Sequence, residues 1–179
     1  MTNSDIISNA PISSEELQQA AQIITALQEE LKTYIAQGSG PFLAAIYDDK
    51  GTLIAKAANS VVKGKCSHKH AEMNAIKQAE EKLNTFDLAP YNLRLYVTAE
   101  PCLMCLGGIM WSGIKTVYFG VPSKRVEEIT GFDEGFKPSW LEEFNKRGIR
   151  VYGNLAPQIG EDILTFYVKN GHPIYKPSR

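Results

Sequence analysis

The sequence predicts an α/β protein in which helices cover one layered sheet. Short apolar runs typical of strands alternate along the chain with segments of helical periodicity, the pattern of such folds. The 179 residues can bury the core of one domain, and 44% hydrophobic with 22% charged residues is typical of globular proteins. We find no repeat or linker, so residues 14–179 are predicted to form a single domain, preceded by a disordered segment, residues 1–13.

The elements follow one another closely after residue 13. A long helix is expected first, because glutamates fill its first turn, apolar residues keep helical spacing, and Gly38 ends it. Helices are expected at 14–37, 71–83, 102–113, 139–148 and 157–171, strands at 41–48, 51–58, 93–98, 114–120 and 149–153, and a loop at 121–137. The helix at 102–113 is apolar on nearly all sides and is therefore expected to be buried.

Two cysteines three residues apart, Cys102 and Cys105, begin the apolar helix directly after a strand. Residues i and i+3 share one helix face, so both sulfurs can reach one ion at the roughly 2.3 Å of Zn–S bonds. The positive end of the helix dipole favours thiolates there. By itself this pair also fits a redox couple or two small core residues.

A second cluster, "KGKCSHKHAE", precedes the helix at 71–83. His70 and Glu72 point to opposite sides of a regular helix, and both can face one ion only if the helix start points at the site. The helical pattern begins at Ala71, which supports that geometry. Alone, the motif also fits a solvated helix start with an acidic residue.

The two motifs together match the H-x-E…P-C-x-x-C signature of zinc deaminases. His70, Cys102 and Cys105 are therefore the predicted Zn²⁺ ligands, one ion per subunit. Three protein ligands leave one position for water, and Glu72 is predicted to activate that zinc-bound water as general acid and base. Cys66 as a fourth ligand would make the site purely structural, and the roles of His68 and of the basic loop 63–69 stay open.

Residues 40–152 resemble the cytidine and deoxycytidylate deaminase superfamily. Within it, "GPFLAAIYD", "HAEMNAI", "EPCLMCLGGIMWSGIKTVYFG" and "GFDEGF" are most similar to bacterial guanine deaminases of the short type. The resemblance implies a three-layer α/β/α fold around a five-stranded mixed sheet. It also implies hydrolysis of a free purine base, guanine to xanthine and ammonia, by a homodimer whose C-terminal tail is a candidate lid.

The resemblance also implies residue roles. Glu134, rather than Asp133, is expected to be the second catalytic carboxylate, which passes protons to the leaving amine. The residues expected to contact the base are Asn59, the backbone of Ala71 and Glu100, and the aromatic side chains of Phe42, Trp111 and Tyr175; Phe132 is a further aromatic candidate.

Other functions remain as alternatives. The same metal site would serve a deaminase of cytosine or another amino-heterocycle such as a triazine, a tRNA adenosine deaminase, or a non-catalytic zinc module. A net charge of −1 disfavours nucleic acid as a partner. The uncharged stretch 101–114 is too short for a membrane span, and an odd number of cysteines without a secretion signal predicts a cytoplasmic protein.

Overall fold

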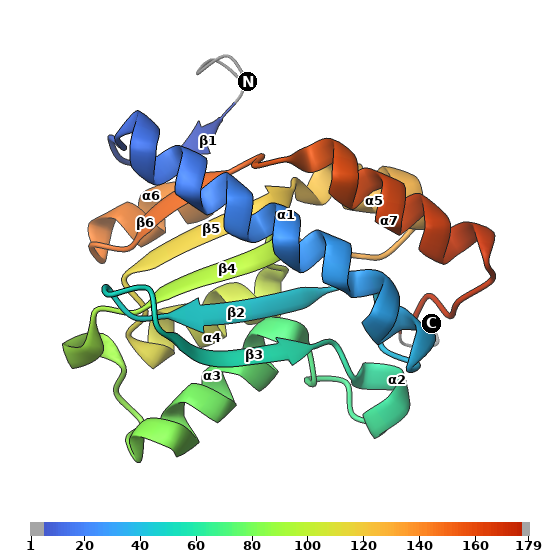
Figure 1. The fold of residues 1–179 in the computed structure, drawn as a ribbon, viewed down its shortest axis with the longest axis horizontal. Coiled ribbons are helices and arrows are strands. Elements are labelled where there is room, and N and C mark those ends of the chain that lie inside the picture. Colours follow the sequence, from blue (N-terminus) through green and yellow to red (C-terminus); the bar gives the residue numbers. More distant parts are fainter. Residues whose placement is uncertain (1–5, 177–179) are drawn as a thin grey trace.

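A computed structural model describes residues 6–176, which form a six-stranded mixed sheet between two layers of helices (Figure 1). The sheet has the order β1-β6-β5-β4-β2-β3. Strands β4, β5 and β6 are parallel to one another, and the other pairs are antiparallel. The strands are β1 (Ile7–Ser8), β2 (Leu43–Tyr47), β3 (Leu53–Ala58), β4 (Arg94–Ala99), β5 (Thr116–Val121) and β6 (Arg150–Gly153).

The sixth strand corrects two predictions. Five strands were expected, and residues 1–13 were expected to be disordered, yet β1 pairs with β6. Asn9 then fixes this segment, since its amide donates to the carbonyls of Leu141 and Ile149 and accepts from the amide of Val151 at 2.8 Å. A strand of two residues is too short to show any periodicity in the sequence. The prediction for residues 1–5 lies outside the described residues.

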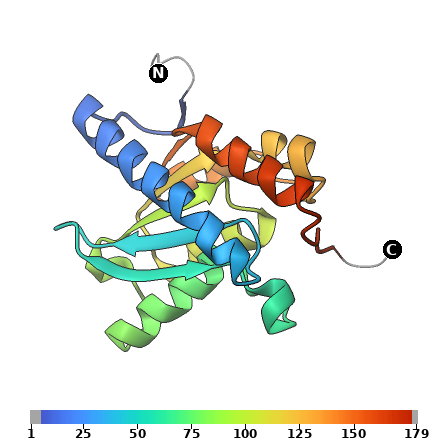
Figure 2. The ribbon, with the colours of Figure 1, turned by 45° about the vertical axis from the view of Figure 1, so that its right-hand side comes forward.

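Helices cover both faces of the sheet, which confirms the predicted three layers (Figure 2). One layer contains α1 (Ser14–Ala36), α5 (Ser123–Thr130) and α7 (Pro157–Lys169), and the other contains α3 (Ala71–Leu83), α4 (Leu103–Ser112) and α6 (Trp140–Lys146). The short helix α2 (Val61–Gly64) and the 3-10 turn η2 (Ala89–Tyr91) lie in connections. In the described part of the chain, no helix is long and apolar enough to cross a bilayer.

Helix α5 lies where the sequence predicted only a loop, so that prediction is wrong for residues 123–130. Eight residues give too few turns for a periodic pattern, but two boundary signals are present. Pro122 occupies the N-cap, and Gly131 ends the helix with φ of +73°, a left-handed conformation that glycine adopts without strain. Val126 is fully buried against the layer formed with α1 and α7.

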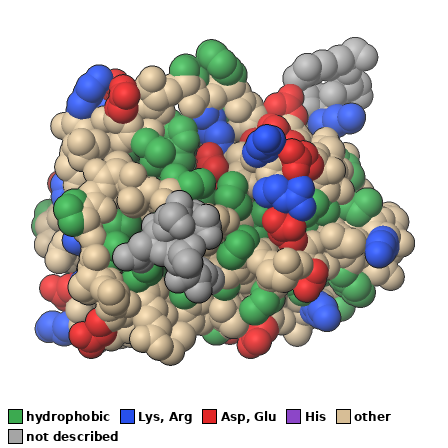
Figure 3. Space-filling view, turned by 90° about the horizontal axis from the view of Figure 1, so that it is seen from above, with side chains coloured by type: hydrophobic (Ala, Val, Ile, Leu, Met, Phe, Trp, Pro, Cys, Tyr) green, Lys and Arg blue, Asp and Glu red, His purple; other side chains and the backbone are tan. Residues whose placement is uncertain are grey.

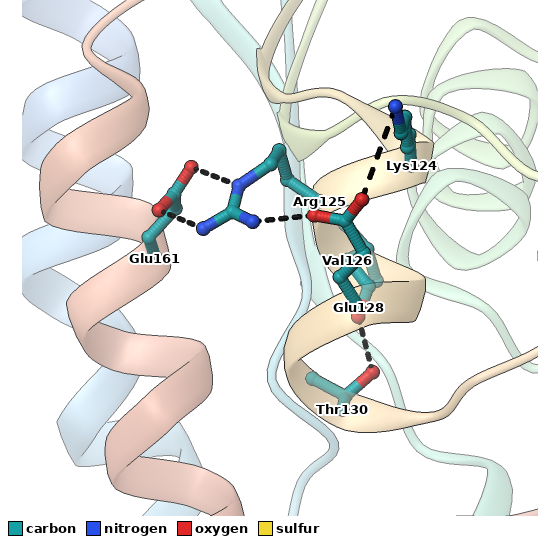
Figure 4. A network of polar contacts seen from close by, with 6 residues as sticks. All are labelled: Lys124, Arg125, Val126, Glu128, Thr130 and Glu161. Atoms are coloured by element: carbon teal, nitrogen blue, oxygen red, sulfur yellow. Dashed lines mark hydrogen bonds and ion pairs between the residues drawn. The ribbon is translucent and has the colours of Figure 1, made fainter.

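Ion pairs join α5 to α7 (Figure 4). The guanidinium of Arg125 donates through Nε and Nη2 to the two carboxylate oxygens of Glu161, at 2.9 and 2.8 Å, and it also pairs with Glu128. Thr130 donates to the carbonyl of Val126 at 2.7 Å in the last turn of α5. The segments that follow α5 and α7 both reach the cavity described below, so this contact fixes the elements that carry them.

The candidate site lies where β4 ends and where α3 and α4 begin. These two helices can approach closely because Gly108 has no side chain, and a Cβ there would overlap Met73 Sδ. Close packing of α3 and α4 brings their N-termini together beside the carboxyl end of β4. The fold therefore joins two motifs that are separated by about 30 residues in the sequence.

Candidate active site

The two predicted helix starts converge as the sequence analysis required. His70 is the N-cap of α3 and Cys102 is the N-cap of α4, and both have extended backbone, with ψ of 158° and 169°. An N-cap side chain lies at the end of the helix and not on its flank, so both can face the space between the helix ends. Cys102 Sγ lies 3.4 Å from His70 Nδ1.

Cys105 completes a ligand set. It is the third residue of α4, so its sulfur lies on the same side as that of Cys102. One ligand atom from each of His70, Cys102 and Cys105 lies within 4.8 Å of the others. One nitrogen and two sulfurs at such separations fit Zn²⁺, whose open catalytic sites have three protein ligands.

The protonation of the two thiols supports a cation site. A hydrogen bond from Cys105 is the main cause that lowers the pKa of Cys102 to about 4, and His70 adds to it. The same hydrogen bond, together with burial, raises the pKa of Cys105. Burial opposes the charge on His70, but its contact with Cys102 leaves its pKa raised overall. Two sulfurs that share one negative charge need a cation to become thiolates together.

Glu72 lies in the first turn of α3, directly beside the ligands, and only 5% of it is exposed. Burial raises the pKa of this carboxyl to about 7, and the negative charge of Cys102 raises it further. A carboxyl with this pKa can accept and return a proton near neutral pH, the property required of a general acid and base.

The neighbouring carboxyl groups of Asp133 and Glu134 differ in burial. Glu134 is 7% exposed, whereas its neighbour Asp133 is exposed and accepts from the amide of Gly135 at 3.0 Å. Burial, and then the charge of Cys102, raises the pKa of Glu134 to about 8. The backbone carbonyl of Glu134 also accepts from the amide of Leu103 at 3.0 Å, so this loop is bonded to the start of α4.

A cavity of about 850 Å³ opens beside the ligand set. Most of the predicted site residues line it: His70, Glu72, Glu100, Cys102, Glu134, Phe42 and Tyr175. Its walls also include residues that the sequence did not assign to the site: Val61, Val62, Lys65, Cys66, Ser67, Ala99, Leu103 and Met104. The volume exceeds that of a single base and falls within the usual range for small-molecule sites.

Asn59 lies behind the cavity wall. Its side chain is fully buried and donates to Tyr175 Oη at 2.6 Å, while its carbonyl oxygen accepts from the amide of Val61. Tyr175 belongs to the tail, residues 172–176, which in this structure lies over the cavity of its own chain. Ala71 is also fully buried, next to His70. Their contacts with a substrate remain predictions.

Three aromatic rings form one side of the cavity. Phe132 packs edge-on against Phe42, with ring centroids 5.4 Å apart, and against Tyr175 at 4.7 Å. Trp111 was expected to join such a group and does not. It is 87% exposed, because the inward face of α4 is formed by residues at other helical positions, such as Cys105 and Ile109. The expectation that α4 is buried on nearly all sides is wrong for the same reason.

The loop before His70 makes no additional metal ligand among the described residues. Cys66 Sγ lies 3.3 Å from His68 Nδ1 and is not part of the ligand cluster. Cys66 and Lys65 line the cavity, whereas His68 does not.

A buried ion pair lies beside the ligands and had no signal in the sequence. Lys137 Nζ lies 2.6 Å from Glu100 Oε1, and both side chains are at most 10% exposed. The two residues are separated by 37 positions. A charge in a loop usually indicates solvation, so only the folded arrangement identifies this pair.

Comparisons with known proteins agree with the motifs. Residues 16–121 match the family described as the cytidine and deoxycytidylate deaminase zinc-binding region. Guanine deaminase of Bacillus subtilis (strain 168) is 38% identical over 97 residues, which are 54% of this chain and 60% of that protein. The tRNA-specific adenosine deaminase of Aquifex aeolicus (strain VF5) is 42% identical over 96 residues, 54% of this chain and 62% of that protein.

The aligned part thus spans less than two thirds of these two relatives. A solved structure extends the similarity, that of a guanine deaminase from Nitrosomonas europaea. It has 35% sequence identity and a TM-score of 0.78, and the alignment covers 90% of this chain and 87% of that one. The similarity therefore extends into the C-terminal half of the chain.

Proposed function

Because the chain belongs to the cytidine and deoxycytidylate deaminase zinc-binding family, we propose that it hydrolyses a free purine base, guanine, to xanthine and ammonia. The observation that most strongly supports this proposal is the pair of buried carboxyls, Glu72 and Glu134, that line one cavity with His70 and Cys102. A structural zinc site needs neither carboxyl. The similarity to two guanine deaminases, one of them over most of both chains, supports guanine as the substrate.

Each residue of the ligand set has a chemical task. His70, Cys102 and Cys105 would hold Zn²⁺, which would supply the Lewis acidity that makes a water molecule easier to deprotonate. The carboxylate of Glu72 would accept a proton from the attacking water and deliver it to a ring nitrogen of the base. The carbon that carried the amino group then gains oxygen and loses nitrogen.

Glu134 completes the proton balance. As the C–N bond breaks, the leaving amino group takes up a proton to depart as ammonia, and the new hydroxyl on that carbon gives up its proton as the carbonyl forms, which replaces the proton that the acid has lost. We assign the role of this acid to Glu134, because it is buried in the cavity wall while Asp133 is exposed. Its pKa, raised to about 8 by burial, allows it to carry a proton near neutral pH.

The remaining cavity residues would orient the base. Phe42, Phe132 and Tyr175 offer aromatic surfaces on which a purine can stack. Asn59 and the backbone of Ala71 and Glu100 supply donors and acceptors for its edge. Because the amide of Asn59 donates to Tyr175, reading of the base by Asn59 depends on the position of the tail.

A tRNA adenosine deaminase is the second candidate, favoured by the 42% identity to the Aquifex aeolicus protein. Binding to RNA depends on neutralising phosphates with many lysines and arginines. The chain has 19 basic and 20 acidic residues. On the face seen in Figure 3, charges of both signs are interspersed and form no basic stripe. These observations favour a small neutral base over RNA.

We further propose a homodimer in the cytoplasm. Helix α4 exposes apolar side chains on its outer face, with 53% of Leu103 and 87% of Trp111 accessible in the single chain. A second copy of the chain would cover this face and lie next to the cavity, because Leu103 also lines it. The three cysteines are free thiols, and thiols that bind metal persist in a reducing compartment.

Ammonia release by the zinc-loaded protein from a panel of substrates tests the proposal. The panel contains guanine, guanosine, adenine, cytosine, cytidine, ammeline and a tRNA anticodon stem. The highest kcat/KM for guanine is the expected result. Turnover only of cytosine or of the RNA would keep the zinc chemistry and reject the substrate, and no turnover by fully zinc-loaded protein would reject the proposal.

A further inference from the structure

The buried ammonium of Lys137 joins three segments around the candidate site. It pairs with Glu100 at 2.6 Å, donates to the carbonyl of Pro101 at 3.0 Å, and contacts Ser123 Oγ. Its side chain is 8% exposed. The other carboxylate oxygen of Glu100 accepts from the amide of Ser123 at 3.0 Å. All three protons of the ammonium therefore have acceptors, as a buried lysine requires.

The three segments are those that shape the cavity. Glu100 and Pro101 directly precede the ligand Cys102, and Ser123 begins α5. Lys137 follows Glu134 by three residues in the same loop. A second contact joins this loop to α4, where the amide of Leu103 donates to the carbonyl of Glu134 at 3.0 Å. The loop is thus joined to the segment around the ligand Cys102 at two points, one on each side of that ligand, and the amide of Glu134 also donates to Glu127 Oε1 of α5 at 3.1 Å.

We propose that Lys137 is a positioning residue that holds the carboxyl of Glu134 against the metal ligands. The inference rests on the function proposed above, in which Glu134 transfers a proton to the leaving amine. Between Glu134 and Lys137 the chain turns at Gly135, whose φ of +79° is a left-handed conformation that glycine adopts without strain. Without the ammonium of Lys137, the hydrogen bond from the amide of Leu103 is what still joins this loop to the start of α4 among the described residues. The carboxyl would then lose its fixed distance from the substrate, on which proton transfer depends.

A purely structural ion pair is the competing explanation, and a double-mutant cycle distinguishes the two. Lys137→Met removes the charge and keeps the length of the side chain. If Lys137 acts through Glu134, this substitution lowers kcat for guanine about tenfold or more in otherwise native protein and by less than about twofold in Glu134→Gln protein. The KM for guanine is expected to change by less than about threefold. Reductions that agree within about threefold in the two backgrounds would overturn the proposal.

Further variants test whether the effect of Lys137→Met comes from misfolding or from loss of the charge. Lys146→Met is the control, since Lys146 lies in α6 with 66% of its side chain exposed and pairs with Glu143 on the surface. Lys137→Arg is expected to restore at least about a third of kcat, because arginine supplies charge and several donors. If Lys137→Met does not fold, Glu100→Gln/Lys137→Met leaves no unpaired buried charge and takes its place in the cycle.

Amide hydrogen exchange of Leu103 in the zinc-loaded protein needs no turnover. Lys137→Met is expected to speed exchange of this amide at least about tenfold, whereas Lys146→Met leaves it unchanged within about twofold. Unchanged Leu103 exchange in Lys137→Met would overturn the proposal. Lack of guanine turnover in native protein would instead reject the proposed function, and the exchange result would still decide whether Lys137 holds the loop.

Discussion

The cavity has two halves that are built differently. The metal half consists of His70, Cys102, Cys105 and Glu72, and every one of them lies within the first turn or at the cap of α3 or α4. The substrate half consists of the loop 131–137 and the tail 172–176, which have no regular structure and are held by side-chain contacts. Local backbone geometry therefore fixes the first half, and distant packing fixes the second.

In the proposed function, the metal half supplies the chemistry and the substrate half selects the base. Helix ends place the ligands and Glu72 with little freedom. In the proposed function, the loop and the tail would select the base, and their positions depend on contacts such as Asn59–Tyr175 and Glu100–Lys137. Changes in the metal half should abolish all turnover, whereas changes in the substrate half should reduce it selectively.

Removal of the metal should have the largest effect. Chelation is expected to reduce guanine turnover to the uncatalysed level and to lower the melting temperature, because the free energy of metal binding no longer stabilises the folded state. Activity and calorimetry before and after dialysis against a chelator, with zinc added back as the control, measure both. Full activity in metal-free protein would contradict the account of this half.

Glu72→Gln is expected to have the second largest effect. It keeps the shape of the side chain and removes its proton transfer, so kcat is expected to fall about 10²–10⁴-fold while one zinc per subunit remains. Metal content and steady-state rates are measured on the same preparation. A variant that retains more than about a tenth of the native rate would exclude Glu72 as the general acid and base.

Glu134→Gln tests the substrate half and should cost less, about 10²-fold in kcat for guanine. Asp133→Asn is the matched control, since that residue is exposed, and it should leave the rate within about twofold of native. If the two variants exchange these behaviours, Asp133 is the second carboxylate. If neither changes the rate, the role assigned to this segment is wrong.

Tyr175→Phe removes the hydroxyl that accepts from Asn59 and keeps the ring. One neutral hydrogen bond corresponds to about 0.5–1.5 kcal/mol, so kcat/KM for guanine should change by about two- to tenfold. Tyr91→Phe, at a half-exposed position in η2, is the control. A loss as large as that of Glu72→Gln would mean that the tail takes part in the chemistry.

The smallest effect concerns the pair that joins α5 to α7. Arg125 is 44% exposed, so Arg125→Gln should lower the melting temperature by at most about 3 °C. Its hydrogen bonds lower the pKa of Glu161 below 4.5. A lowered pKa stabilises the fold above pH 4.5, and this contribution disappears as the pH falls through the folded pKa. Native and variant melting temperatures should therefore converge in acid, and a constant difference would contradict this cause.

The same contrast explains what the sequence could reveal. His70, Glu72, Cys102 and Cys105 were predictable because their spacing and their helix starts are local features. The strand β1 and helix α5 were not, since Asn9 and Val126 take their structure from contacts with distant segments. The Lys137 pair and the outward direction of Trp111 likewise appear only when the elements are packed.

Conversion of guanine by the zinc-loaded protein in water enriched in ¹⁸O tests the central claim most directly. Hydrolytic deamination predicts one ammonia for each guanine consumed, and xanthine that carries one ¹⁸O at the carbon that lost the amino group. Guanine that binds to zinc-loaded protein and is recovered unchanged, or ammonia without labelled xanthine, would contradict the account.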